Sequence, residues 1–362
     1  MESGIYRAID ANINRAMEGL RVCEDIMRFT LGIADYSEKL KGLRHEVASA
    51  AGMFPREALL DSREVESDSG KFYDLPGEKK RESAGDMLGA NIHRAIEALR
   101  SLEEFSKLVQ CDNRDNLFQR IRFSLYSLEK QMGSRVRRDD RVRRLRGSLY
   151  CIIDSAFVQE GRYTETADQM IKGGAGVIQL RMKGAPAREM LPVARELAEI
   201  CKQAGLLFIV NDHADIACLA GADGLHLGQE DLPVSEARRI VPASMIIGIS
   251  THSPEQAAEE EANGPDYIAV GPVFDTGSKN GTTLEGIGTD AVRNVCAHTG
   301  LPVVAIGGIT PESAKELEGT GCASVAVISY IYRNGAIKDN CRELARMAKS
   351  ITVRAAEGPD PG

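Results

Sequence analysis

Short apolar runs alternate with longer amphipathic segments through the C-terminal part of the chain. Each run is four or five residues long and rich in β-branched residues, and the segments between them, such as 187–204 and 253–263, have helical spacing. Runs of this kind predict buried strands, and the spacing between them predicts helices. The predicted strands are 149–153, 177–180, 207–210, 224–227, 245–249, 267–270, 303–306 and 324–328.

The number and rhythm of these units predict the fold class. Eight strand–helix units within about 200 residues are typical of a (β/α)8 barrel. An open, doubly wound sheet is the alternative, but no Gly-x-Gly-x-x-Gly motif follows the first predicted strand. Functional residues of a barrel lie at the C-terminal ends of its strands. We therefore expect the active site there.

The N-terminal part has apolar residues at helical spacing and repeats itself. Residues 11–25 match residues 90–104, and residues 40–44 match residues 118–122. In the first copy, Ile13, Met17 and Leu20 follow one another at i, i+4 and i+7. This pattern predicts an all-α domain, a helical bundle built from two copies of a helix pair.

An arginine-rich segment separates the two patterns. Residues 135–146 contain seven arginines and two aspartates. We interpret the segment as a solvated helix end and linker rather than a nucleic-acid arm, because no aromatic residues or groove-forming pattern accompany it. The predicted organisation is a helical domain at 1–134, a linker at 135–146, a barrel domain at 147–350 and a flexible tail at 351–362.

Composition narrows the setting in which the protein works. The chain has 362 residues and a net charge of −8, which gives no reason to expect nucleic acid. Its eight cysteines are widely spaced without a C-x-x-C motif, which argues against a zinc site or a disulfide framework. No signal-peptide pattern or membrane-spanning apolar run is present. We expect a cytoplasmic enzyme of small molecules that does not bind membranes. The sequence does not determine the oligomeric state, and a homo-oligomer is one of the alternatives.

Cationic side chains lie at the end of the second predicted strand. Gln179, Arg181 and Lys183 occupy alternate positions, and alternate residues of a strand share a face. Two cations held side by side are costly unless an anion neutralises them. We expect a polyanionic ligand at this strand end.

Two carboxylates, Asp212 and Asp231, follow the next two strands. Oxygen ligands of this kind suit Mg²⁺, which typically binds one or two carboxylates together with substrate phosphates. Helix-capping aspartates are the alternative interpretation. We assign the neighbouring His213 and His226 to packing or supporting positions, because nothing near them in the sequence completes a nucleophile or zinc set.

A second anion site is predicted at the last two strands. Gly307-Gly308 ends the seventh predicted strand and Ile328-Ser329 ends the eighth. Backbone N–H groups at these two loops form the phosphate site of many barrels. A glycine pair needed only for a tight turn is the alternative. Two anion sites in one barrel suggest two phosphorylated substrates, one of them a diphosphate.

Taken together, these motifs resemble the thiamine phosphate synthase family, whose members join a pyrimidine to a thiazole. The resemblance covers residues 147–335 and implies a barrel transferase. The implied substrates are hydroxymethylpyrimidine diphosphate and hydroxyethylthiazole phosphate, as its carboxylated tautomer, although the exact tautomer is left open. The matching motifs are Gln179-Leu-Arg-Met-Lys183, Asn211-Asp212, Gly224-Leu-His-Leu-Gly-Gln-Glu-Asp231, Gly271-Pro-Val-Phe-Asp-Thr-Gly-Ser-Lys279 and Ala305-Ile-Gly-Gly-Ile309.

The resemblance also implies a role for each matching residue. The implied catalytic cations are Arg181, Lys183 and Lys279. The implied ligands of the pyrimidine diphosphate are Gln179, Arg181, Lys183, Asn211, Ser250 and Lys279. The implied ligands of the thiazole phosphate are Thr276, Ser278, Gly308, Ile328 and Ser329. The implied cofactor is Mg²⁺, bound by Asp212 and Asp231.

In the family's reaction, diphosphate leaves the pyrimidine methylene and the thiazole nitrogen captures the resulting carbocation. Such a dissociation needs stabilisation of the leaving group and positioning of both substrates rather than a protein nucleophile. This sequence departs from the family at Ile153, Ser278 and His213, where threonine, threonine and arginine are common. A thiazole tautomerase on the same barrel is the alternative, but it typically lacks the full set of cations and metal ligands.

The N-terminal part resembles a helical domain that is fused ahead of some thiamine phosphate synthases. That domain has been proposed to phosphorylate the pyrimidine monophosphate, and an assembly or regulatory role is the alternative. Identical residue types recur between the two copies, although such faces are usually solvated. They are Asn12, Arg15, Glu18 and Arg21, repeated as Asn91, Arg94, Glu97 and Arg100. No Gly-x-x-x-x-Gly-Lys-[Ser/Thr] loop is present, so a nucleotide site would be of an unfamiliar kind. Ser62-Arg63 and Asp68-Ser-Gly70 are the predicted loop residues of such a site.

Overall fold

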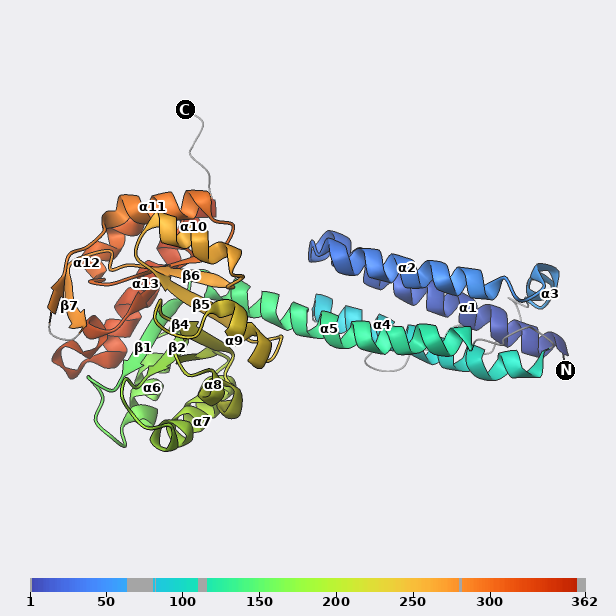
Figure 1. The fold of residues 1–362 in the computed structure, drawn as a ribbon, viewed down its shortest axis with the longest axis horizontal. Coiled ribbons are helices and arrows are strands. Elements are labelled where there is room, and N and C mark those ends of the chain that lie inside the picture. The colour runs from blue at the N-terminus through green and yellow to red at the C-terminus, as the bar shows by residue number, and fades with distance from the viewer. Residues whose placement is uncertain (1, 64–80, 82, 110–115, 280–281, 357–362) are drawn as a thin grey trace, which may run out of the picture. The chain divides into compact units, whose positions relative to one another are not determined.

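The computed structural model describes residues 2–63, 81, 83–109, 116–279 and 282–356. The chain divides into two compact units, Met1–Val136 and Arg137–Gly362 (Figure 1). Among the described residues, none of the helices combines the length and the apolar character that crossing a bilayer requires.

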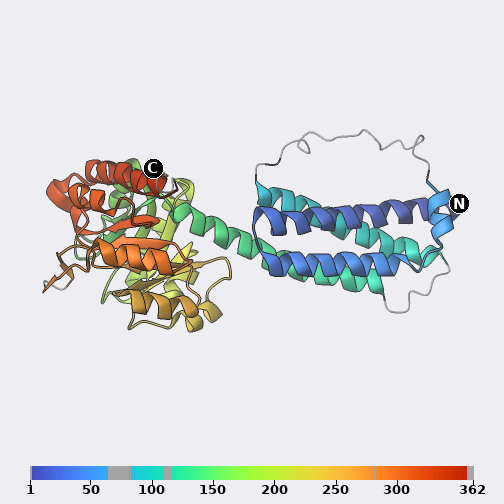
Figure 2. The same ribbon diagram turned by 90° about the horizontal axis from the view of Figure 1, so that it is seen from above.

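Long helices that run side by side make up the first unit (Figures 1 and 2). This confirms the predicted all-α domain. The repeated segments lie in α1 and α2 for the first copy and in α4 and α5 for the second, as a repeated helix pair requires. The long helices are α1 (Glu2–Asp25), α2 (Ala34–Ala51), α4 (Ala84–Phe105) and α5 (Leu117–Leu145). Shorter pieces are η1 (Ile26–Thr30), α3 (Arg56–Asp61) and η2 (Ser106–Leu108).

The first unit has its own core because each helix buries one apolar stripe. Leu20 and Leu40 from the first copy are fully buried, as are Leu99 and Phe118 from the second, and the four side chains belong to one cluster. Helices α1 and α4 approach closely at Gly19, where a Cβ atom would lie 2.7 Å from the backbone oxygen of Asn91. The core therefore joins the two copies into one bundle.

In the described part of the second unit, eight parallel strands close into a barrel, as the sequence predicts. Their order around the barrel is β1-β10-β9-β6-β5-β4-β3-β2. The strands are β1 (Leu149–Asp154), β2 (Ala175–Arg181), β3 (Leu207–Asn211), β4 (Gly224–Leu227), β5 (Ile246–Thr251), β6 (Tyr267–Val270), β9 (Val303–Ile306) and β10 (Ser324–Val327). After β6 the chain also forms a short antiparallel pair, β7 (Thr276–Lys279) with β8 (Thr282–Leu284), which the sequence analysis did not predict.

Helices follow most of the strands and cover the barrel. They are α6 (Tyr163–Lys172), α7 (Ala187–Gln203), α8 (Ala214–Ala220), α9 (Val234–Ile240), α10 (Pro254–Ala262), α11 (Gly288–His298), α12 (Pro311–Ala314), η3 (Lys315–Leu317), η4 (Ser329–Gly335) and α13 (Ile337–Ala356). Their apolar faces pack on the outward side chains of the strands in one continuous core. Helix α13 runs past the predicted domain end at residue 350, so residues 351–356 of the predicted tail are helical, and residues 357–362 lie outside the described part.

The arginine-rich segment is helical, because α5 continues to Leu145. Its last turns belong to the second unit and close the N-terminal end of the barrel. Leu145 is fully buried with the first residues of several strands, among them Tyr150. Arg141 pairs with Asp223 at 2.7 Å, and Arg138 pairs with Asp266 at 3.4 Å. These carboxylates precede β4 and β6, so part of the arginine charge is neutralised by the barrel itself.

Candidate active site

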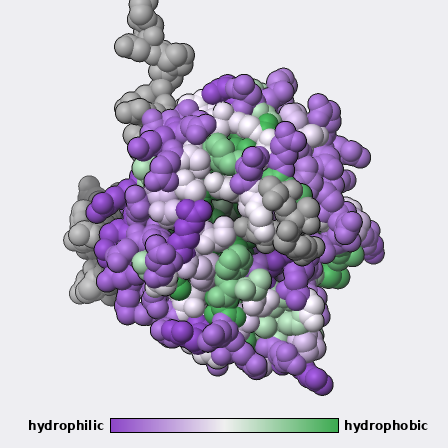
Figure 3. Space-filling model, turned by 90° about the vertical axis from the view of Figure 1, so that its left-hand side faces the viewer, coloured by the Kyte–Doolittle hydropathy of each residue, from purple (hydrophilic) through white to green (hydrophobic). Residues whose placement is uncertain are grey.

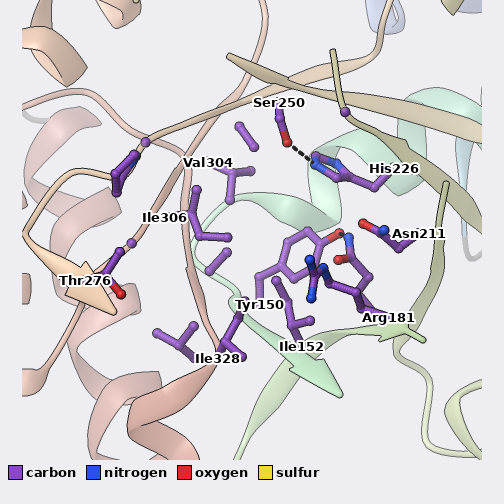
Figure 4. Close-up of a pocket in the computed structure, with 18 of the residues that line it drawn as sticks. Tyr150, Ile152, Arg181, Asn211, His226, Ser250, Thr276, Val304, Ile306 and Ile328 are labelled. Atoms are coloured by element: carbon purple, nitrogen blue, oxygen red, sulfur yellow. Dashed lines mark hydrogen bonds between the residues drawn. The ribbon is translucent and has the colours of Figure 1, made fainter. Parts of the chain in front are cut away.

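A pocket opens at the C-terminal ends of the barrel strands. Figure 3 shows this mouth as a hollow with apolar residues in its wall and polar surface around it, and Figure 4 shows the lining side chains. Most of the predicted site residues line this one pocket. They are Gln179, Arg181, Lys183, Asn211, Asp212, Asp231, Ser250, Thr276, Gly308, Ile328 and Ser329.

The structure does not test whether the side chains of two predicted site residues, Ser278 and Lys279, line the pocket. Their backbone belongs to β7, but their side chains lie outside the part that the structure describes. Thr276 begins the same strand and lines the pocket.

The cations at the end of β2 are already paired with carboxylates of the barrel. Arg181 forms an ion pair with Asp154, the last residue of the neighbouring strand β1, and Lys183 forms one with Asp212. Asp154 is almost completely buried, whereas about half of the Lys183 side chain is exposed. The sequence predicted that a ligand would neutralise these cations. In the structure, Asp154 neutralises Arg181. The register of β1 against β2 places these two residues side by side.

Asp212 and Asp231 lie side by side. Burial and the neighbouring Asp231 raise the pKa of the Asp212 carboxyl, even though Lys183 acts in the opposite direction. The pKa of Asp231 is lowered in spite of burial, because Asp231 shares a hydrogen bond with the Asp212 carboxyl and accepts one from the backbone N–H of Gly228 at 2.7 Å. Two adjacent carboxylates resist double ionisation unless a cation joins them. The pair therefore suits a divalent cation.

The donor set restricts which metal the pair would hold. Among the described residues, no group of three or more His, Cys, Asp and Glu side chains is arranged to bind a metal ion. A closed zinc site requires such a group, but Mg²⁺ does not, since water and substrate phosphates complete its shell. Asp212 has left-handed backbone geometry (φ 63°), and its N–H donates to the carbonyl of His226 at 2.8 Å. This fixes the loop that carries the carboxylate against the neighbouring strand β4.

His226 lines the pocket, is almost completely buried and hydrogen-bonds to two hydroxyl groups. Its Nε2 lies 2.9 Å from Ser250 Oγ (Figure 4), and its Nδ1 lies 3.0 Å from Tyr267 Oη. Burial lowers the pKa of the imidazole to about 4, so the ring is neutral near pH 7. Sequence reasoning missed this pair of His226 and Ser250, because only the register of β4 against β5 brings the two residues together.

The Ser250–His226 pair has the distance of a nucleophile and its general base. Two observations argue against that use. An imidazole with a pKa of about 4 is a weak base at neutral pH. The group at Nδ1 is a tyrosine hydroxyl, which carries no charge to stabilise an imidazolium. The pair is better suited to hold a ligand than to attack it.

The loop after β9 requires its two glycines. Gly307 (φ 103°) and Gly308 (φ 67°) both have backbone conformations that side chains disfavour. A Cβ atom on Gly308 would lie 2.7 Å from the backbone oxygen of Phe274. Because the backbone of Gly308 lines the pocket without a side chain in the way, a ligand can approach it closely.

The chain matches two protein families and is similar to known thiamine-phosphate synthases. Residues 149–331 match the family described as "Thiamine monophosphate synthase", and residues 7–131 match the "ThiD2 family". The chain is 37% identical to the thiamine-phosphate synthase of Gloeobacter violaceus, an alignment that covers 91% of this chain and 93% of that one. It is 36% identical to the enzyme of Prochlorococcus marinus, covering 90% and 92%.

A solved structure resembles the second unit. Thiamine phosphate pyrophosphorylase from Pyrococcus furiosus is 36% identical, with a TM-score of 0.53. It covers 57% of this chain, whereas 98% of its own length is matched. The solved relative therefore accounts for a part of this chain only, while the two curated relatives extend over most of it.

Proposed function

This chain belongs to the thiamine monophosphate synthase family and is a transferase that forms thiamine phosphate, and we propose that the pocket at the barrel mouth binds both of its substrates. The two curated relatives and the solved structure are all described as synthases or pyrophosphorylases, which favours the transferase over the tautomerase alternative. The proposed reaction joins the pyrimidine methylene to the thiazole nitrogen and releases diphosphate.

One observation carries the proposed arrangement. The adjacent carboxylates Asp212 and Asp231 line the same pocket as Arg181 and Lys183, and the glycine loop at Gly308 lines it too. A diphosphate with its metal is therefore proposed to lie at the ends of β2 to β5. The thiazole phosphate is proposed to lie at the ends of β9 and β10, where Gly308, Ile328 and Ser329 present backbone groups, with Thr276 and Ser278 on the β7 side.

The residues derive their proposed roles from charge and position. Asp212 and Asp231 would hold Mg²⁺, which supplies positive charge to the diphosphate as its bond to carbon breaks. Arg181, Lys183 and Lys279 add positive charge at the same group, and Gln179, Asn211 and Ser250 orient the pyrimidine diphosphate. Arrangement of two substrates face to face removes most of the entropic cost of their encounter. No step requires a protein nucleophile, which agrees with the weak basicity of His226.

Magnesium dependence of ligand binding tests the metal site. We expect the full-length chain to bind the pyrimidine diphosphate at least about tenfold more tightly with Mg²⁺ than without, because the adjacent carboxylates repel a diphosphate in the absence of the metal. Isothermal titration calorimetry measures this ratio. The pyrimidine monophosphate serves as a control ligand and should show a smaller ratio. Equal affinity of the diphosphate with and without Mg²⁺ would contradict the proposed site.

For the first unit we propose a kinase activity that supplies the diphosphate. The terminal phosphoryl group of ATP would move to a phosphate oxygen of the pyrimidine monophosphate, giving the diphosphate and ADP. The match of residues 7–131 to a separate family supports a function of its own for this unit. Its described residues offer a polar cluster in which Arg63 binds the buried Asp10 through two hydrogen bonds of 2.8 Å, and Asn14 donates to Asp10 at 3.3 Å. The predicted loop residues 68–70 lie outside the described part.

The kinase proposal is tested in a full-length chain whose barrel has been disabled by Asp231→Asn, so that the diphosphate accumulates. We expect ³¹P NMR to show one diphosphate and one ADP formed per ATP consumed. Adding Asp10→Asn should reduce this rate at least about tenfold, since it removes a charge-assisted hydrogen bond. Asp35→Asn, at an exposed position of α2, is the matched control. Absence of diphosphate in the Asp231→Asn chain would leave the first unit with a structural or regulatory role.

A further inference from the structure

A chain of hydrogen bonds crosses the barrel interior beneath the pocket. Gln179 Nε2 donates to Tyr150 Oη at 2.7 Å, and Tyr150 Oη lies 3.0 Å from Tyr267 Oη. Tyr267 Oη lies 3.0 Å from His226 Nδ1, and His226 Nε2 lies 2.9 Å from Ser250 Oγ. The chain thus starts at β2, passes through β1, β6 and β4, and ends at β5. Gln179 and Ser250 at its ends line the pocket, and so do Tyr150 and His226.

Tyr267, at the centre of this hydrogen-bond chain, is fully buried, and the residues on either side of it are at most 8% exposed. Tyr150 and Tyr267 are among the largest fully buried side chains, and Gln179 is 2% exposed. The Tyr267 ring occupies the space that a side chain at position 248 would need, because a Cβ atom on Gly248 would lie 2.0 Å from the ring. Buried polar groups must find their partners within the protein. The hydroxyl groups and the imidazole therefore satisfy one another, and each proton has a fixed place.

Counting protons gives the chain a direction. Each tyrosine has one O–H, and a neutral imidazole has one N–H. When the Gln179 amide donates to Tyr150, Tyr150 must donate to Tyr267 and Tyr267 to His226 Nδ1. The imidazole proton then lies on Nε2 and is donated to Ser250. Ser250 can donate its own proton in a hydrogen bond to a ligand in the pocket, and the amide oxygen of Gln179 can accept a hydrogen bond from that ligand.

Only one other arrangement keeps the protons of both tyrosines and of the imidazole within the hydrogen-bond chain. If the Gln179 amide turned over, its oxygen would accept from Tyr150, and every proton along the chain would be reversed. Ser250 would then donate to His226 and present only lone pairs to the pocket. The hydrogen-bonding characters of Gln179 and Ser250, which stand on different strands, are therefore coupled through Tyr150, Tyr267 and His226.

We propose that Tyr150, Tyr267 and His226 are positioning residues that select a 4-aminopyrimidine over its 4-oxo counterpart. This rests on the proposed binding of the pyrimidine diphosphate by Gln179 and Ser250. When the Gln179 amide donates to Tyr150, the Gln179 oxygen accepts from the exocyclic amine, and Ser250 donates to an acceptor atom of the same ligand. An oxo group would face the Gln179 oxygen as a second acceptor. Relieving that clash by turning the amide would reverse the chain and remove the Ser250 donor, so the oxo ligand loses a hydrogen bond in either state.

Tyr267→Phe tests the coupling, because it keeps the ring and removes the hydroxyl in the middle of the chain. We expect the preference for the amino over the oxo pyrimidine diphosphate, measured as a ratio of kcat/KM values, to fall about tenfold, the contribution of one neutral hydrogen bond. The change should be mainly in KM. Tyr332→Phe is the matched control, since its hydroxyl donates to the Ile152 carbonyl at 3.0 Å outside the chain. Tyr150→Phe should reproduce the effect if Tyr267→Phe fails to fold.

A second readout is independent of activity. In the wild-type protein, ¹⁵N NMR of His226 should show a single neutral tautomer with its proton on Nε2, and in Tyr267→Phe a mixture of both. A proton on Nδ1 in the wild type, or an unchanged amino-to-oxo preference in both tyrosine variants, would overturn the proposal. A wild-type enzyme that binds neither pyrimidine diphosphate would instead count against the proposed substrate site. The tautomer measurement would still test the proton order along the hydrogen bonds from Gln179 to Ser250.

Discussion

Replacement of Asp231 by asparagine is expected to lower kcat at least about 100-fold and to change the KM for the pyrimidine diphosphate much less. The amide has nearly the same shape and retains an oxygen that can accept from the Gly228 N–H, which the carboxylate binds at 2.7 Å. What it removes is one of the two charges that we propose to hold Mg²⁺. Groups directed at charge that develops in a transition state contribute about 10²–10³ in rate. Steady-state kinetics at saturating Mg²⁺ measures the effect.

The same variant should also change the pH dependence of metal binding. Burial and Asp231 raise the pKa of Asp212, so protonation of Asp212 weakens metal binding as the pH falls through that raised value. Without the Asp231 charge, the pKa of Asp212 drops and the acid limb moves to lower pH. Asp215→Asn, at an exposed neighbouring position, is the control and should change neither kcat nor the acid limb. Wild-type kcat in Asp231→Asn would mean that the metal lies elsewhere.

The barrel could be predicted because its strands are buried on both faces. Predicted strands 224–227 and 267–270 coincide with β4 and β6, since a buried parallel strand is a short, uninterrupted apolar run with clear ends. The barrel rule then placed Asp212, Asp231 and Gly308 at one mouth from their positions after strands alone. That step needed only the order of elements and no knowledge of side-chain contacts.

Contacts that depend on strand register could not be predicted in this way. The pairing of Arg181 with Asp154 joins two strand ends, and the bond between Tyr150 and Tyr267 joins residues separated by 117 positions. Both tyrosines look like ordinary strand residues in the sequence. Residues 135–146 were predicted as a solvated helix end and linker because of their charge, whereas the structure gives Arg138 and Arg141 carboxylate partners on the barrel. Charge alone does not reveal whether a partner is near.

Replacement of Glu103 by alanine is expected to destabilise the first unit by about 3–5 kcal/mol. Glu103 is almost completely buried on α4, and it accepts hydrogen bonds from Arg122 of α5 and, at 2.8 Å, from Arg100. Removal of the carboxylate leaves the Arg122 guanidinium, whose side chain is only 11% exposed, without its counter-charge, and this penalty exceeds the net value of the pair. Glu24 has the equivalent position in the first copy, 3.1 Å from Arg44, so a glutamate–arginine pair is present in both copies of the repeat.

Hydrogen exchange of the α4 and α5 amides under increasing urea would measure this loss without interference from the barrel. Glu104→Ala is the matched control, because Glu104 is half exposed and its surface ion pairs should contribute less than about 1 kcal/mol. The double variant Glu103→Leu with Arg122→Leu should be less destabilised than Glu103→Ala, because neither charge is then left alone. Similar losses in Glu103→Ala and Glu104→Ala would contradict the assignment of a buried pair.

The pH dependence supplies an independent check with a defined sign. Burial alone would raise the pKa of Glu103, but the hydrogen bonds from Arg122 and Arg100 hold it below the ordinary glutamate value. A carboxylate with a depressed pKa in the folded state stabilises the fold above its unfolded pKa of about 4.3. That contribution is lost as the pH falls through the folded value. The difference in stability between the wild type and Glu103→Ala should therefore be full at pH 7 and shrink below about pH 4.3.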